Sequence, residues 1–275
     1  MKSVARACLL VGIAVAMRAQ DPDAAPAAPA VLPVQPLRLE LGGYGDYFQN
    51  AGGWWRGFDS TLWIRKSPKF VPALTFDSRT SNAGTERYYS FFSYANWTPN
   101  FFTTQAVAGT PDGGTATLPL LFPRLRYDAK AWWKLPPHRR AVAGLGFTRY
   151  TLDNRLSGTI INPGLLYYTG PLVFDLEGFV NRTEPGSFWS GSGLLAVQQG
   201  REGNHWVGVS VGAGRQTYRE LMNLPLAVRF ASVSVDTFYR KWLTRNFGVV
   251  VSAGYFDAFH TYQRFLVTGH IFFEF

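Results

Sequence analysis

Hydrophobic and polar residues alternate in short segments over most of the chain beyond residue 36. In residues 207–214, VGVSVGAG, valine and alanine side chains share one face of an extended strand, while glycine and serine share the other. Residues 122–134 alternate in the same way, with arginine, aspartate and lysine on one face. Period two is typical of β-strands, and no long segment has the 3.6-residue period of an amphipathic helix. The pattern therefore predicts an all-β fold.

Fourteen segments of this kind follow one another along the chain. They are residues 37–48, 54–66, 69–79, 86–97, 100–109, 122–134, 139–150, 156–168, 171–182, 187–199, 203–214, 225–241, 246–256 and 264–275. Bacterial transmembrane barrels have an even number of strands, which alternate between lipid and lumen in segments of about ten residues. We therefore predict a single transmembrane, antiparallel, up-and-down β-barrel of about 14 strands, with 12 strands as the alternative.

The connections between these segments alternate between two kinds. Every second connection is tight, as at Ser67-Pro68, Pro136-Pro137 and Thr169-Gly170. The others are expected to form mostly longer loops, and include residues 80–86, 109–121, 215–225 and 257–264. Short periplasmic turns and longer outward loops are the arrangement of bacterial outer-membrane barrels.

Composition favours a membrane barrel over a soluble β-sandwich, which is the alternative interpretation of the same alternation. Charged residues make up 16% of the chain and aromatic residues another 16%, whereas a soluble domain has about 25% charged residues. The net charge is +9, but lysine and arginine do not cluster and no nucleic-acid-binding motif is present. We therefore expect no nucleic-acid partner.

The first 36 residues differ from the rest of the chain. A basic start, an apolar stretch from residue 7 to 17 and small residues near 19 predict a secretory signal peptide over residues 1–19. Residues 20–36 are rich in proline and alanine and are expected to be a disordered tether, followed by the barrel over 37–275. The only cysteine is Cys8, and no His/Asp/Glu spacing resembles a metal site, so no metal or cofactor is expected.

The last segment ends in alternating aromatic residues. In outer-membrane barrels, which this segment resembles, a final strand that ends in phenylalanine is the recognition signal for the barrel-assembly machinery. The resemblance makes Phe273 and Phe275 the membrane-insertion signal, although His270 stands where that signal usually has glycine. The expected partners are thus this machinery, the outer-membrane bilayer and its lipopolysaccharide, with the barrel as a monomer in the outer membrane.

Charged residues on the polar faces of the segments are expected to line the lumen, because arginine or lysine facing lipid at the bilayer midplane costs about 2 to 4 kcal/mol. Two interpretations remain open. The charges either pair in a network that plugs the barrel, or line a hydrated passage in which segment 122–134 is a basic ladder favouring anionic solutes. The expected lumen residues are Arg124, Arg126, Asp128, Lys130, Trp132, Asp175, Glu177, Asp236, Asp59 and Asp77.

The string Gly-Val-Ser-Val-Gly at 208–212 matches the G-x-S-x-G pattern of hydrolases. In those enzymes the serine lies on a strand-to-helix turn, whereas here it lies within a strand pattern, so small lumen residues explain it better. An outer-membrane lipid or lipid A hydrolase, with His260 near the outer rim, is kept as the alternative. We expect the protein not to be an enzyme.

Residues 122–275, and more loosely the chain from 37, resemble the YaiO family of outer-membrane β-barrel proteins. The resembling stretches are RLRYDAKAWWKL, INPGLLYYTGPLVFDLEGFV, NHWVGVSVGAGRQTY and Tyr262-Gln263-Arg264 with the strand after it. The resemblance implies an outer-membrane location and carries no catalytic residues. The leading hypothesis is a passive channel, or an accessory for passage or export of a small or saccharide-like envelope solute; a plugged structural barrel is a further alternative.

Overall fold

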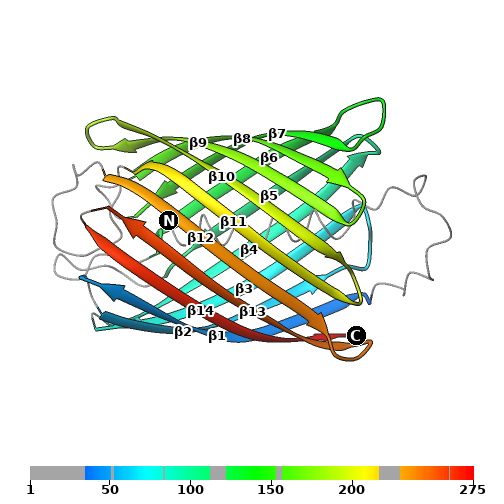
Figure 1. The fold of residues 1–275 in the computed structure, drawn as a ribbon, viewed down its shortest axis with the longest axis horizontal. Helices are drawn as coiled ribbons and strands as arrows, with labels where there is room; N and C mark the ends of the chain where they lie inside the picture. The colour runs from blue at the N-terminus through cyan, green and yellow to red at the C-terminus, as the bar shows by residue number, and fades with distance from the viewer. Residues whose placement is uncertain are drawn as a thin grey trace.

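The computed structural model describes residues 35–50, 53–82, 84–111, 122–152, 157–216, 230–259 and 261–275. These residues form a closed barrel of 14 antiparallel strands (Figure 1). The strands are β1 (Leu37–Gln49), β2 (Gly53–Ile64), β3 (Phe70–Ser81), β4 (Gly84–Thr98), β5 (Phe101–Gly109), β6 (Leu125–Lys134), β7 (Ala141–Thr151), β8 (Ser157–Thr169), β9 (Leu172–Glu184), β10 (Phe188–Arg201), β11 (His205–Gln216), β12 (Phe230–Trp242), β13 (Phe247–Ala258) and β14 (Tyr262–Glu274). The predicted fold and the count of 14 are confirmed.

Each strand pairs with its neighbours in the chain, and β1 closes the barrel by pairing with β14. The closing pair continues to its end, where the N–H of Leu37 donates to the carbonyl of Phe275 at 2.9 Å and the N–H of Phe275 donates back at 3.0 Å. β1 has 13 residues, or about 40 Å of extended chain. At the usual strand tilt of 35–45° this covers about 30 Å, enough for the hydrocarbon layer of a bilayer.

The two ends of the barrel differ in their connections. We call the end where β1 begins and β14 ends the terminal end, and its turns include 99–100, 170–171 and 202–204. The opposite end, the loop end, carries the connections 110–124 and 217–229. Two predicted loops there are wrong, because β3 and β4 extend to Ser81 and Gly84, and β13 and β14 reach Ala258 and Tyr262. Residues 80–82, 84–86, 257–259 and 261–264 are thus mostly strand, while Ala83 and His260 lie outside the described residues.

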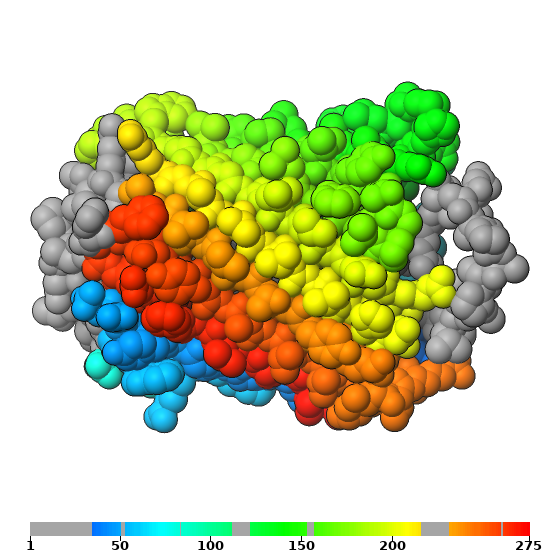
Figure 2. Space-filling model, viewed as in Figure 1, coloured from blue at the N-terminus to red at the C-terminus, as the bar shows by residue number. Residues whose placement is uncertain are grey.

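The alternation predicted from the sequence separates an apolar outside from a polar inside. Figure 2 shows the outer wall as diagonal bands of side chains that follow the tilted strands. Its exposed members are mostly large apolar residues, and tryptophans are among the most exposed near strand ends: Trp54, Trp97, Trp133 and Trp189. Tryptophans exposed on the outer wall near strand ends suit the headgroup level of a membrane.

Within the described ranges no helix is long and apolar enough to cross a bilayer. The predicted signal peptide and almost all of the tether, residues 1–34, lie outside the described residues.

Candidate functional site

The lumen contains a cavity of about 300 Å³. Its wall is lined by inward residues of many strands and by both signs of charge. The carboxylates are Glu40, Asp59, Asp77, Asp128, Asp175, Glu177 and Asp236, and the basic side chains are Arg79, Arg126, Lys130, Arg240 and Arg264, with His270 beside them. A closed sheet brings these residues together because every second side chain of each strand points inward.

Lys130 reaches across the wall to partners on two other strands. From β6 its Nζ donates to Glu177 Oε1 on β9 at 2.6 Å and to Asn162 Oδ1 on β8 at 2.7 Å. Gly164 lies between them, and a Cβ there would come within 2.7 Å of Nζ. The ion pair therefore depends on a glycine that leaves room for the lysine side chain. Both charged groups are buried, with 9% and 5% of the side chain exposed.

Asp59 and His270 pair in the same manner across β1. Nε2 of the histidine lies 2.9 Å from Oδ2 of the aspartate. Gly42 is the register partner of both residues, on β2 and on β14. A Cβ at Gly42 would lie 1.9 Å from the imidazole ring, so only glycine lets the ring cross β1.

Two more carboxylates are held by neighbouring side chains. Asp128 accepts two hydrogen bonds from Arg126, at 2.7 and 2.6 Å, and one from the hydroxyl of Thr148 at 2.6 Å. Asp77 accepts a hydrogen bond at 2.8 Å from the hydroxyl of Tyr44. Carboxylates bonded in this way are fixed in position on the wall.

Asp175 and Asp236 are less well satisfied. Oδ1 of Asp175 is buried and makes no hydrogen bond to the described residues. Asp236 lies opposite Ser210 on β11 and Gly254 on β13, and Arg264 is the positive charge that interacts with it. The cavity thus keeps acceptor groups that the wall does not fully use.

Eight of the ten residues expected in the lumen line the cavity, and Arg124 and Trp132 do not. Arg124 precedes β6 at the loop end and is exposed, so it is not part of the strand wall. Trp132 points inward but is only 1% exposed, because it packs against other rings. The other two cations of the expected basic ladder, Arg126 and Lys130, are each paired with a carboxylate. This strand therefore does not present a row of free positive charge.

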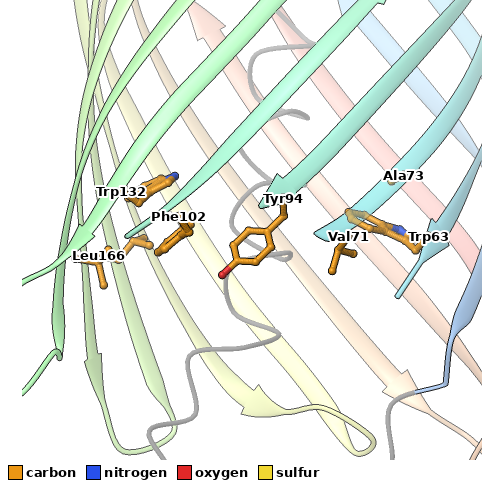
Figure 3. Packing of buried hydrophobic residues seen from close by; sticks show 8 residues of the cluster. Trp63, Val71, Ala73, Tyr94, Phe102, Trp132 and Leu166 are labelled. Atoms are coloured by element: carbon orange, nitrogen blue, oxygen red, sulfur yellow. The ribbon is translucent and has the colours of Figure 1, made fainter. Parts of the chain in front are cut away.

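Trp132 belongs to a set of buried apolar residues around the terminal end of the lumen, which we call the aromatic belt. Its ring stacks with that of Phe102, with centroids 5.9 Å apart and an interplanar angle of 14°. Figure 3 shows these two rings beside Leu166, with Tyr94 between them and Trp63. The belt consists of Trp63, Val71, Ala73, Tyr94, Phe102, Trp132, Val142 and Leu166, and on the other side Trp242, Val250 and Phe272.

Six charges lie next to the belt at the terminal end, and we call them the terminal charge network: Arg38, Arg65, Arg240, Glu40, Glu202 and Glu274. Arg38 is fully buried; its Nε donates to Glu274 at 2.7 Å, and its Nη2 pairs with Glu202. Arg65 contacts the same two glutamates at 3.1 Å. Burial, together with the neighbouring Arg38, lowers the pKa of the Arg65 guanidinium.

Sequence reasoning missed Glu202, Arg240 and Arg264 as lumen charges. Arg240 shares its strand face with Asp236, which was a signal available in the sequence. Glu202 lies in the turn between β10 and β11, where period two no longer indicates a direction. The sequence therefore does not indicate that a charged residue in such a turn points into the lumen.

The remaining expected residues lie on the wall. Phe273 and Phe275 are exposed by 40% and 53%. Ser210 lies within β11 and lines the cavity, which agrees with a strand rather than a hydrolase turn.

An apolar outer face, aromatic residues near strand ends and a charged lumen define the protein as a transmembrane β-barrel of the outer-membrane type. Residues 38–219 match the model of the YaiO membrane beta barrel domain, and the chain belongs to this family. No curated protein sequence matches the chain significantly.

Solved structures with the same fold are distant in sequence. A bacterial polysaccharide outer membrane secretin has a TM-score of 0.58 at 8% identity, over 88% of this chain and 99% of that chain. The CymD monoaromatic hydrocarbon channel has a TM-score of 0.58 at 10% identity, over 88% and 89%. The outer membrane protein Omp33 of Acinetobacter baumannii has a TM-score of 0.50 at 13% identity, over 88% and 98%. At these identities the likeness shows the fold alone.

Proposed function

We propose that this protein is a non-enzymatic outer-membrane barrel that lets a small, saccharide-like envelope solute enter or pass its lumen. The observation that carries the proposal is the cavity of about 300 Å³ lined by both carboxylates and basic groups. Sugar hydroxyls donate and accept hydrogen bonds, so a wall that offers both kinds of partner suits them. The names of two structures with the same fold, a polysaccharide secretin and a hydrocarbon channel, agree with a channel-type role.

The charge balance of the cavity argues for a different selectivity than a basic ladder would give. Seven carboxylates face five arginine and lysine side chains, with His270 as a further group. A lining with excess negative charge attracts cations and repels anions. We therefore propose that small ions pass with a cation preference and that the solute itself is not a strong anion.

Single-channel conductance of the refolded chain in a planar bilayer tests the proposal. Steady steps with cation preference are expected, and Arg126→Ser should increase that preference because it frees the negative charge of Asp128. Arg124→Ser is the matched control, since Arg124 lies outside the cavity lining and should leave selectivity unchanged. Anion preference in the unmodified protein would contradict the proposed lining.

A closed structural barrel is the second candidate, and the terminal end favours it. The aromatic belt and the arginines of the terminal charge network are buried where the passage would have to continue. A correctly folded chain that gives no conductance, and still gives none after Trp132→Ala, would support this candidate over the channel.

We further propose that the chain is exported through a cleaved signal peptide and acts as a monomer. Its insertion by the barrel-assembly machinery would use Phe273 on β14 and Phe275 directly after it, whose exposure leaves both rings accessible.

A further inference from the structure

Two arginines on the outer wall point away from the lumen near the loop end. Arg149 on β7 and Arg182 on β9 are register partners of the same residue, Thr159 on β8. Strands in a sheet lie about 4.8 Å apart, so the two backbones are about 10 Å apart. Both side chains stay substantially exposed, by 41% and 44%. An arginine facing hydrocarbon is costly at the midplane and nearly free at the interface, so this position marks the headgroup level.

The two guanidinium groups converge on one carboxylate. Nη2 of Arg149 lies 3.7 Å and Nη2 of Arg182 lies 3.5 Å from the carboxylate of Glu184. These distances are long for an ion pair with hydrogen bonds, and two positive charges share one negative charge. The cluster therefore keeps an excess positive charge and free donor capacity on the outside of the barrel.

The next row of outward residues toward the middle of the wall is apolar. Phe147, Ile161 and Val180 are direct register partners, and each lies two residues along its strand from the polar row. They are exposed by 47%, 41% and 45%. A positive row directly beside an apolar row on a lipid-facing wall matches an amphiphile with an anionic headgroup and acyl chains.

Trp189 completes the polar row on β10, where it is the register partner of Arg182. Its ring is 58% exposed, and the guanidinium carbon of Arg182 lies 5.9 Å from the ring centroid. Hydroxyl groups of Thr159, Ser157 and Ser187 accept hydrogen bonds from the two arginines at 3.0 Å. The row thus combines two arginines held by hydroxyl groups with an exposed tryptophan ring. Arginines bind phosphate and aromatic rings stack on sugars, so this combination suits a phosphorylated sugar.

We propose that this row, Arg149–Thr159–Arg182–Trp189, binds the phosphorylated disaccharide of lipid A at the outer leaflet. The loop end faces outward if the short turns lie in the periplasm, as in bacterial barrels. Arginine forms paired hydrogen bonds to phosphate, and the apolar row beneath would contact the acyl chains. The inference depends on this orientation and is independent of any transport through the lumen.

Native mass spectrometry of the full chain refolded in detergent tests the proposal, with lipid A, phosphatidylglycerol or phosphatidylethanolamine added. We expect lipid A to bind most tightly, and Arg149→Gln with Arg182→Gln to weaken it by about tenfold or more, because charge-assisted hydrogen bonds are lost. Arg56→Gln is the matched control. Arg56 is an exposed outward arginine near the loop end whose register partners, Gly45 and Thr80, carry no charge.

Glu184→Gln should have the opposite effect and tighten lipid A binding, because it removes the carboxylate that competes for both arginines. A merely structural role of the cluster would not produce a gain. Equal binding by the double variant and the unmodified chain would overturn the proposal, as would an equal loss in Arg56→Gln. Phosphatidylglycerol binding as tight as lipid A would overturn the assignment to a phosphorylated sugar lipid.

Discussion

Replacing Glu177 by glutamine is expected to destabilise the barrel, because it removes the negative charge beside the buried ammonium group of Lys130. Nζ donates to Glu177 at 2.6 Å and to Asn162 at 2.7 Å. It also lies 4.3 Å from the centroid of the Trp132 ring. The substitution keeps the shape of the side chain, so the measured change reports the charge and not a cavity.

The size of the effect depends on what remains around the lysine. Removing one partner of a fully buried ion pair costs about 3 to 5 kcal/mol. Here Asn162 still accepts a hydrogen bond, and Asp175 lies two residues from Glu177 on the same face of β9. Part of the compensation therefore survives, and we expect a loss of about 2 kcal/mol, the value of one hydrogen bond to a charged group.

Urea unfolding of the refolded chain in phosphatidylcholine vesicles, followed by tryptophan fluorescence, measures this loss. Asp175→Asn is the control on the same strand face. Oδ1 of Asp175 makes no hydrogen bond to the described residues, so neutralising it should leave stability unchanged or raise it. Free energies of unfolding of the two variants that agree within about 0.5 kcal/mol would contradict this expectation. Loss of the charge that pairs with buried Lys130 should destabilise the barrel more than loss of the charge of Asp175.

Three further changes have expected outcomes. Gly57→Ala should lower the free energy of unfolding by about 1 to 3 kcal/mol, because its Cβ would lie 2.1 Å from the ring of Tyr44. Gly269→Ala is the control, with no atom within 4 Å of its Cβ, and should unfold like the unmodified chain. Glu202→Gln should raise the frequency of open events in a planar bilayer, because it removes the carboxylate that pairs with Arg38 and Arg65 in the terminal charge network. An unchanged frequency of open events would exclude the Glu202 turn as a barrier to conduction. Phe275→Ser should reduce the amount of protein in the outer membrane of cells and leave refolding in detergent unchanged, since its ring is exposed; equal loss in both assays would contradict a signal role.

The wall of the barrel was predictable because alternation is a local property. One face of each strand contacts lipid and the other contacts the lumen, so the sequence of a single segment carries its own direction. Asp59, Asp77 and Glu177 were placed in the lumen in this way, and all three line the cavity. The strand count came from the same pattern, since each segment is long enough to cross the membrane once.

Side-chain partners were not predictable, because they depend on the closure of the sheet. Arg38 contacts Glu202, which is 164 positions away in the chain. Lys130 was expected to repeat the charge of Arg126 along a ladder, but each pairs with an acid, one on β9 and one on its own strand. The face of a residue is a local property, whereas its ion-pair partner depends on the curvature of the whole barrel.

Inward glycines offer a signal that could indicate such partners from sequence. Gly42 and Gly164 lie on charged strand faces. A Cβ would collide at Gly42 with His270 of the neighbouring β14, and at Gly164 on β8 with Lys130 of β6, two strands away. A glycine in a strand interior weakens the strand and often marks a close approach of other groups. On the lumen face of a barrel that approach comes from a strand one or two places away, as from β14 onto β1 and from β6 onto β8. Inward Gly57, Gly158 and Gly248 face aromatic rings, so an inward glycine indicates that a large side chain crosses its strand. At Gly42 and Gly164 that side chain belongs to an ion pair, and such pairs leave fewer charges to line a passage.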